Sequence, residues 1–399
     1  MNKTRSISQL FTFAILVVAS VVAVFGQKTV EPRIFLLQIS SADAAKKPSD
    51  PALGKIERDA KRALTEKVEP VTSKTSTPPS GDKHDYMSQA PYFWKNPDTA
   101  NGLPYIRRDG ERNPEIKNYP DHDLMDKMVV TVERLSVGYF VTHKPEYAAR
   151  AAEILRMWFL DPKTRMNPNL EFAQAIPGLN TGRGIGIIET RGLTRVVDSI
   201  GLLAGSQSWS KSDQAGLEDW FSRYLAWMME SKNGKNESAA KNNHGTHYDV
   251  QAACFALFVH KDDLAKKILE AAKEKRIESQ IRPDGQQPLE LERTKSWSYS
   301  VMNLDGMVNL AQLGDHVGLD LWSYQNSKTG GIRRAILFLA PFAREPKKWP
   351  HKQIEPLEPQ GYYKIVGRAG RKYKDAEIQK IASLAATDGG SGKTPLDPQ

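Results

Sequence analysis

The sequence predicts an all-α protein built from helical hairpins, arranged either as a closed (α/α) toroid or as an open solenoid. Apolar side chains recur at helical spacing in successive stretches after about residue 120. Alternating patterns typical of β-strands are nearly absent, and no motif recurs at a fixed period. Helix–turn–helix units that repeat in kind without repeating in sequence are typical of such arrays.

The first residues have the pattern of a secretory signal peptide. Lys3 and Arg5 give a positive start, an apolar stretch follows, and small residues near Gly26 offer a cleavage point. The apolar stretch is short for a membrane span, so we expect cleavage rather than an uncleaved anchor helix. The mature protein would then be periplasmic or secreted, with no stable membrane insertion.

One domain is expected for residues 27–387, between the signal peptide at 1–26 and a disordered, glycine-rich tail at 388–399. It begins with a helix at about residues 51–66. Residues 81–113 are aromatic and rich in turn-forming residues, with neither a helical nor a strand pattern. Long irregular segments inside a domain are usually functional or disordered, and the aromatic content argues against disorder.

Helical hairpins follow this irregular segment. Pro145 is placed to start one helix, because proline is well tolerated in the first turn. Ser210, with Asp213 three residues later, forms a capping box and starts another. The remaining helices are predicted around residues 124–139, 193–200, 246–259, 262–275, 297–313 and 329–343.

The charge and cysteine content limit the classes of function. The chain of 399 residues has a formal net charge of +9, which suits an acidic partner. Lysine and arginine are spread along the chain instead of forming a run, so an acidic polymer is favoured over nucleic acid. Cys254 is the single cysteine, which excludes an intrachain disulfide and a thiolate metal cluster. Its apolar surroundings predict a buried, inert thiol.

A first polar cluster occupies residues 241–251. It contains Asn242, Asn243, His244 and His247 directly before an apolar stretch. Thr246 and the carboxylate three residues on read as a capping box, which predicts that a helix starts near residue 246. The two asparagines and His244 would then lie in the loop before that helix, where functional side chains often lie.

A second polar cluster occupies residues 290–300, and we expect the two clusters to meet across one cleft. Arg293 and Tyr299 are its most specific pair. A nearby guanidinium stabilises a phenolate and lowers the tyrosine pKa, which makes the side chain usable as an acid or base. The alternative is a packed tyrosine with the arginine on a surface carboxylate.

Other chemistries find weaker support. His244 and His247 can share a helical face, but zinc needs a third ligand. We therefore expect no metal, no cofactor, activity that survives EDTA, and a structural hydrogen bond for His247.

Residues 181–186 resemble part of a nucleotide-binding loop but follow no strand, so they predict a glycine-rich loop before a helix. Asn180, directly before it, can point into a cleft. Glycoside hydrolysis needs two carboxylic acids, and Glu290 with Glu292 or Asp284 could supply them, so a glycoside hydrolase remains an alternative.

The combination of Asn242-Asn243-His244 with Arg293 and Tyr299 resembles the alginate lyase superfamily. The likeness is closer to polysaccharide lyase family 38, through residues 81–88, 242–251 and 287–294, and it covers about residues 32–350. It implies an (α/α) toroid, an incomplete barrel of helical hairpins, that depolymerises uronic-acid polysaccharides by β-elimination. The Arg-to-Tyr spacing of six residues departs from the seven of well-known alginate lyases.

The resemblance also implies roles for individual residues. Asn243 and Arg293 would bind the substrate carboxylate, His244 would be a base or proton partner, and Tyr299 the acid. The candidate substrate-binding residues are Asn180, His84, Tyr86, Asn242, Glu237 and Trp94. The partner would be an acidic polysaccharide, either alginate or glucuronan, while the oligomeric state stays open.

The chemistry of β-elimination fits these residue types. The C5 proton is acidic enough only if the charge growing on the uronate carboxylate is neutralised by preorganised donors. When the C5 hydrogen and O4 lie on one side of the ring (syn), as in mannuronate and glucuronate, one tyrosine can serve as base and acid. In guluronate they lie on opposite sides (anti), so histidine and tyrosine would divide the roles. A glycoside hydrolase and a non-catalytic glycan-binding protein are the alternatives.

Overall fold

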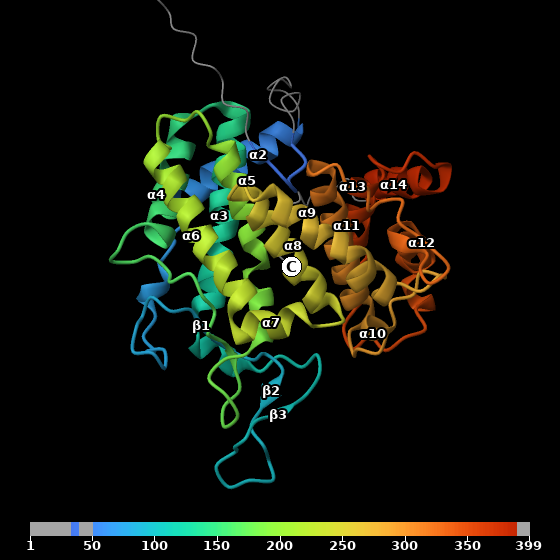
Figure 1. Ribbon diagram of the computed structural model, residues 1–399, viewed down its shortest axis with the longest axis horizontal. Helices are drawn as coiled ribbons and strands as arrows, with labels where there is room; N and C mark the ends of the chain where they lie inside the picture. The colour runs from blue at the N-terminus through green and yellow to red at the C-terminus, as the bar shows by residue number, and fades with distance from the viewer. Residues whose placement is uncertain (1–32, 40–50, 389–399) are drawn as a thin grey trace, which may run out of the picture. The chain divides into compact units, whose positions relative to one another are not determined.

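The inner helices of the fold form a row in which each helix contacts the next. The row consists of α3 (Asp121–Thr142), α5 (Leu193–Leu202), α8 (Asn243–Phe258), α11 (Ser296–His316) and α13 (Gln360–Ala369). Outer helices pack against the row, and these are α4 (Pro145–Phe159), α6 (Lys211–Glu230), α9 (Asp262–Ala272), α12 (Gly331–Arg344) and α14 (Ala376–Asp388). This inner and outer arrangement (Figure 1) is an (α/α) toroid, which confirms the predicted fold class.

The computed structural model describes residues 33–39 and 51–388. The predicted signal peptide and residues 389–399 of the predicted tail lie outside this range, while Asp388 is the last residue of α14. Among the described residues, no helix combines the length and apolar character needed to cross a membrane.

Helix α8 is the centre of the core. It contacts α5, α6, α9 and α11, and every side chain from Gly245 to Phe258 is buried. A helix enclosed on all sides becomes apolar all round once its polar first turns end, which explains the run from Ala252 onward. Cys254 is fully buried in it, and burial raises the pKa of its thiol well above the usual value. The prediction of an inert thiol is confirmed.

Local signals predicted several helix starts correctly. Helix α2 spans Pro51–Thr65, Pro145 is the first residue of α4, and Ser210 caps α6 through a complete capping box with Asp213. The predicted start of α8 near Thr246 is wrong. The helix begins at Asn243, because the side chain of Asn242 accepts the backbone N–H of His244 and caps the helix earlier.

The residues of the expected capping box have other partners. The hydroxyl of Thr246 donates to the side chain of Gln280 at 3.0 Å, and Asp249 accepts from Arg276 at 2.7 Å. Short helices also escaped prediction, because one or two turns show too little periodicity. They are η1 (Val71–Ser73), η2 (Pro114–Asn118), α7 (Lys232–Ser238), α10 (Pro288–Leu291), η4 (Lys273–Glu278) and η5 (Pro346–Lys348), and the glycine-rich loop becomes η3 (Gly184–Gly192).

The segment predicted as irregular contains short strands. β1 (Met87–Gln89) pairs parallel with β4 (Phe172–Ala175), and β2 (Phe93–Trp94) pairs antiparallel with β3 (Ile106–Arg107). We call residues 90–113, which include β2 and β3, the arm. A small apolar cluster of Ala90, Tyr105 and Ile176, with Phe93 against it, joins the arm to the chain after β4.

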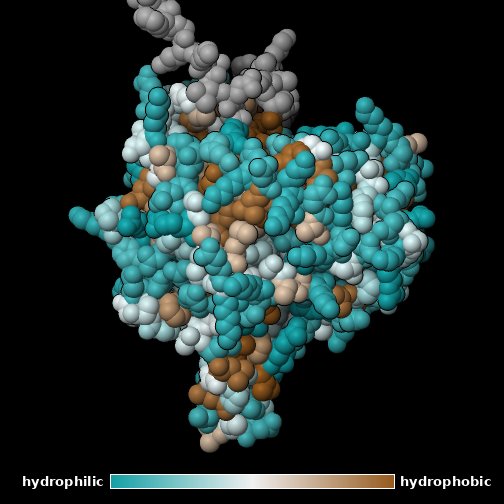
Figure 2. Space-filling model, in the orientation of Figure 1, coloured by the Kyte–Doolittle hydropathy of each residue, from teal (hydrophilic) through white to brown (hydrophobic). Residues whose placement is uncertain are grey.

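The arm projects from the helices at the bottom of the view in Figure 1. Figure 2 shows apolar surface over this projecting part. Leu103 of the arm is 36% exposed, and Leu179, in the adjoining loop, is 59% exposed. Exposed apolar side chains next to polar ones on a projecting element indicate a binding surface.

Candidate active site

The two polar clusters meet at the N-terminal ends of the adjacent inner helices α8 and α11. Asn243, the first residue of α8, donates its backbone N–H and its side-chain amide to the two carboxylate oxygens of Glu290, each at 2.7 Å. Both residues are buried. Burial raises the pKa of Glu290, although the hydrogen bonds from Asn243 oppose the rise. The predicted meeting of the two clusters is therefore confirmed, while the cleft between them stays a prediction.

His244 is held by Glu237 of α7. Its Nδ1 lies 2.7 Å from the Oε1 atom of Glu237, whose side chain is only 1% exposed. A buried carboxylate that accepts the Nδ1–H leaves Nε2 as the nitrogen with the free lone pair. The second oxygen of Glu237 has no hydrogen-bond partner among the described residues. The expected substrate-binding residue Glu237 thus lies behind His244, where it orients the ring.

Tyr299, in the first turn of α11, contacts both Arg293 and the arm. The guanidinium carbon of Arg293 lies 3.7 Å from the centroid of the Tyr299 ring, so the predicted pair is confirmed. The Tyr299 hydroxyl donates to the hydroxyl of Tyr92 at 2.9 Å. Burial raises the Tyr299 pKa, the neighbouring Tyr92 adds to the rise, and Arg293 opposes it. The expected net lowering is wrong, because burial outweighs the guanidinium.

Asp109 of the arm occupies most of the donors of Arg293. The Nη2 of Arg293 donates to its carboxylate at 2.8 Å, Nε donates at 3.2 Å, and Arg107 adds a bond at 2.6 Å. Thr294 contributes its backbone N–H and its hydroxyl. Burial of Asp109 favours a higher pKa, but these hydrogen bonds hold it well below its usual range. The arm is therefore anchored to the second polar cluster.

Two further residues of the first cluster have structural contacts. Asn242 is the cap of α8. His247 is buried, and its Nε2 lies 3.1 Å from the carbonyl oxygen of Met302. Burial, with Arg191 nearby, lowers its pKa to about 4, so the ring is neutral near pH 7 and donates to that carbonyl. The structural hydrogen bond predicted for His247 is confirmed.

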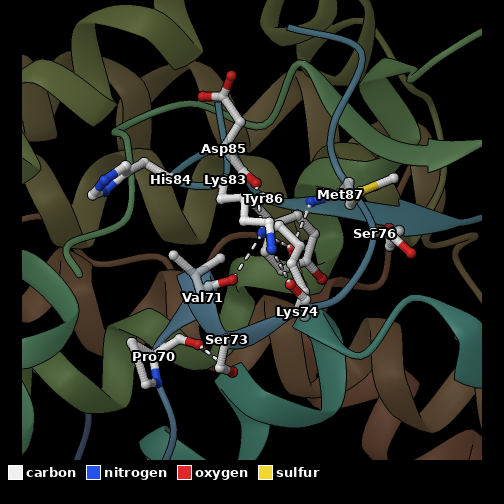
Figure 3. Close-up of polar contacts among 12 residues, drawn as sticks. Pro70, Val71, Ser73, Lys74, Ser76, Lys83, His84, Asp85, Tyr86 and Met87 are labelled. Carbon is white, nitrogen blue, oxygen red and sulfur yellow. Dashed lines mark hydrogen bonds and ion pairs between the residues drawn. The ribbon is translucent and has the colours of Figure 1, made fainter. Parts of the chain in front are cut away.

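Tyr86 is fully buried, and its hydroxyl donates to Glu189 at 2.7 Å. The segment that carries it is fixed by Lys74, whose ammonium group is buried and donates to Asp121 at 2.6 Å and to the Asp85 carbonyl at 2.8 Å. Figure 3 shows Lys74 and Tyr86 packed together, with His84 pointing away from both. We therefore expect Tyr86 to have a structural role and not to contact sugar.

The remaining candidates lie at the surface. His84 contacts the carbonyl of Arg165 at 2.5 Å, and none of its hydrogen bonds within residues 33–39 and 51–388 reaches the two clusters. Trp94 is half-buried on the arm, where its indole N–H donates to the Glu111 carbonyl at 2.9 Å. Asn180 is exposed in the loop after β4 and accepts the backbone N–H of Ile176. Of these, Trp94 lies on the element that contacts Tyr299.

Sequence reasoning did not single out Tyr92 and Asp109 as site candidates, and it did not predict the contact of Glu237 with His244. Tyr92 and Asp109 lie within the aromatic segment of residues 81–113, so composition marked the region without marking the residues. Glu237 precedes His244 by seven residues and lies on a helix too short to show a periodic pattern. Nothing in the local sequence indicates that its carboxylate faces the imidazole.

Comparison with known proteins agrees with this geometry. The sequence model of the alginate lyase family matches residues 70–349, a range that includes the arm and both clusters. A crystal structure of an alginate lyase from Bacteroides ovatus is 35% identical, covers 88% of this chain and 95% of its own, and has a TM-score of 0.84. No protein with a curated description matches the chain.

More distant structures share the fold. A tetrasaccharide complex of alginate lyase A1-III is 16% identical, covering 85% of this chain and 87% of its own, with a TM-score of 0.57. Alginate lyase A1-III from Sphingomonas species A1 is 14% identical, covering 82% and 89%, with a TM-score of 0.52. Family match, relative and fold agree: this chain belongs to the alginate lyase family and is a polysaccharide lyase.

Proposed function

We propose that the protein cleaves a uronic-acid polysaccharide, either alginate rich in mannuronate or glucuronan, by β-elimination. The observation that carries the proposal is that His244, held by Glu237, and Tyr299, whose hydroxyl is a hydrogen-bond donor, lie at the N-terminal ends of the adjacent inner helices α8 and α11. The net charge of +9, which becomes 9 − 2 = +7 once Lys3 and Arg5 leave with residues 1–26, supports a polyanionic substrate.

The elimination needs a base at C5 and an acid at O4. As the base removes the C5 proton, the electron pair forms the C4–C5 double bond, and the C4–O4 bond breaks. The departing O4 takes a proton from the acid. The raised pKa of Tyr299 keeps its hydroxyl protonated at neutral pH, which suits the acid. The Nε2 of His244 is the candidate base, and the carboxylate of Glu237 would stabilise the imidazolium that forms.

Carboxylate neutralisation is assigned to Asn243 and Arg293, as the family resemblance implies. In this structure most of their donors point at Glu290 and Asp109. The Nη1 group of Arg293 makes no hydrogen bond to the described part of the chain, so it can reach a substrate carboxylate. Arg293 would then lie between the carboxylate of the substrate and that of Asp109.

The activity is tested with alginate, polymannuronate, polyguluronate and glucuronan, by following the ultraviolet absorbance of the unsaturated product. A hydrolase would release reducing ends without this absorbance, and a binding protein would release neither. For His244→Ala we expect a loss of about a thousandfold or more on every substrate that the wild type cleaves. If activity survives on mannuronate and glucuronate, Tyr299 acts as both base and acid on these syn substrates, and the assignment of the base to His244 fails.

We also propose that the chain is exported to the periplasm or the medium with removal of residues 1–26. The charge and hydropathy pattern of that segment supports this. Fractionation of expressing cells and the N-terminal sequence of the recovered protein test it. An intact Met1 on protein retained in the membrane would favour the uncleaved anchor.

A further inference from the structure

Arg183 is a half-buried arginine beside the arm that forms no ion pair within the described part of the chain. Its Nε donates to the backbone carbonyl of Gln174 at 3.2 Å, and Nη2 donates to the Gln174 side chain at 2.9 Å. The guanidinium carbon lies 5.0 Å from the centroid of the Phe93 ring. No carboxylate of residues 33–39 or 51–388 lies within the 4.0 Å of an ion pair, and Nη1 makes no hydrogen bond to them.

A partly buried cation costs free energy unless an anion compensates for the water that it has lost. Partial burial removes water from the guanidinium, and the neutral amide groups of Gln174 replace only part of that hydration. Burial, followed by the nearby Arg107, lowers the Arg183 pKa to about 10, although the carboxylates of Glu189 and Glu237 oppose the shift from beyond ion-pair distance. The group therefore stays charged at neutral pH and gains from an anion in direct contact. The arginine at the other side of the site, Arg293, already has its anion in Asp109.

The acceptors that hold Arg183 are themselves fixed in a strained conformation. Gln174 has φ 50°, a left-handed value that non-glycine residues rarely adopt, and its side chain is buried. Its backbone N–H donates to the hydroxyl of Ser88 at 2.7 Å, and Ser88 donates to Glu189. Backbone strain that the surroundings maintain is concentrated at binding and catalytic sites. The strain here holds one guanidinium in place.

Arg183 lies close to the proposed catalytic groups. A Cβ atom added to the next residue, Gly184, would lie 2.5 Å from the carbonyl oxygen of Asn233 and 3.2 Å from the backbone N of Glu237. The backbone here therefore lies directly against α7, whose Glu237 holds His244. On its other side Arg183 contacts Phe93 of the arm. The guanidinium also interacts electrostatically with Arg107 of the arm and with Glu237, so it lies near both the arm and the His244 side of the site.

We propose that Arg183 binds the carboxylate of a uronate residue that adjoins the one undergoing elimination. The inference rests on the proposed function and adds a second anion site to it. Because Arg183 lies beyond Glu237 and not at the reacting atoms, it contributes to substrate affinity more than to the chemical step. The enzyme would favour polymers in which consecutive sugars carry carboxylates, with Phe93 beneath the guanidinium restricting its orientation.

The kinetic test compares Arg183→Met with Arg223→Met, an exposed arginine of α6 that pairs with Asp219 away from the site. On the best polyuronate, we expect Arg183→Met to raise KM about ten- to a hundredfold, with kcat within a few-fold of wild type. Arg223→Met should change neither. An unchanged KM, or a loss confined to kcat, would overturn the proposal.

A binding test separates recognition of charge from a structural role. Calorimetry in the Tyr299→Phe background measures the affinity for uronate oligomers and for the same oligomers with their carboxyl groups reduced to alcohols. Arg183→Met should weaken only the charged oligomers, by about ten- to a hundredfold, and Arg183→Lys should recover part of the loss. Equal weakening of charged and neutral oligomers would mean that the substitution merely disturbs the arm.

The two proposals fail in different ways. If the wild type forms no unsaturated product from any uronate polymer, the proposed function fails. If it forms product but Arg183→Met behaves as wild type, only the role of Arg183 fails. Thermal unfolding of each variant checks folding. If Arg183→Met does not fold, Arg183→Gln, which keeps a side-chain donor without the charge, takes its place with the same expectations.

Discussion

The ends of the inner helices and the arm meet at Tyr299, but they are built in opposite ways. His244 and Asn243 start a buried helix, and each is paired with a carboxylate that is itself about 1% exposed, Glu237 and Glu290. The arm has strands of two residues, and it is anchored to the second cluster through Asp109 and the hydroxyl of Tyr92.

The buried helix ends and the projecting arm are suited to two different tasks, proton transfer and recognition of the polysaccharide. Proton transfer needs groups held within a fraction of an ångström, which packed helices with buried partners provide. Recognition of a chain of sugars needs an accessible surface that can adjust, which a projecting element with half-buried Phe93 and Trp94 provides. We therefore expect substitutions at the helix ends to lower kcat strongly, and those on the arm to have milder effects. The following predictions test this comparison, from the largest expected effect to the smallest.

Replacement of Tyr299 by phenylalanine should have the largest effect. It removes the proposed acid and keeps the ring that stacks on Arg293, so kcat should fall by about a thousandfold or more while oligomer binding persists. Initial rates of unsaturated product and calorimetric affinities measure both. Tyr119→Phe, outside the site, is the matched control. Turnover within a few-fold of wild type would falsify the role of Tyr299 as the acid.

The buried His247 should make the stability of the folded protein sensitive to acid. Its folded pKa of about 4 lies below the usual 6.5, so the unfolded state binds more protons between these values, and stability falls as pH decreases through them. The contribution present above about pH 6.5 is at most about 3 kcal/mol. Buried acids titrate here too, so the difference between variant and wild type is the quantity to measure.

Chemical denaturation at several pH values should show a shallower acid decline for His247→Gln than for wild type. His260→Gln, which changes an exposed histidine, should retain the wild-type slope. An identical slope in the His247 variant would mean that burial at the end of α8 is less complete than the structure has it.

Glu237→Gln should lower kcat about ten- to a hundredfold, because an amide still contacts His244 but cannot stabilise the imidazolium. KM should stay within a few-fold, and Glu237→Asp should restore part of the rate. The exposed pair of His260 with Glu218 is the control, and Glu218→Gln should leave the kinetics unchanged. A change confined to KM would place Glu237 among the sugar-binding residues instead.

Tyr92→Phe should have the smallest effect, a few-fold in kcat/KM. The substitution removes the acceptor of the Tyr299 hydroxyl but leaves the ring and the Asp109 contacts of the arm. A single neutral hydrogen bond contributes about 1 kcal/mol. A loss as large as that of Tyr299→Phe would show that Tyr92 takes part in proton transfer, and the division between helix ends and arm would not hold.

Local sequence patterns determined the helical framework and the region of the site. The 3.6-residue periodicity, Pro145 and the Ser210 capping box act within one or two turns, so they can be read without knowing how the helices pack. The same holds for Cys254, whose apolar neighbours already indicate burial. The start of α8 was misread because two capping signals lie four residues apart, and the partners of Thr246 and Asp249 come from η4 and the residues after it.

Only the tertiary structure decided which polar groups pair within the site. Arg293 meets Asp109 across 184 positions of sequence, and Tyr299 meets Tyr92 across 207. Burial likewise reversed the expected direction of the Tyr299 pKa shift, since desolvation depends on everything packed around a group and not on its nearest charge. That the guanidinium of Arg183 forms no ion pair with the described residues is visible only in space, because a sequence gives the number of charges but not the distances between them.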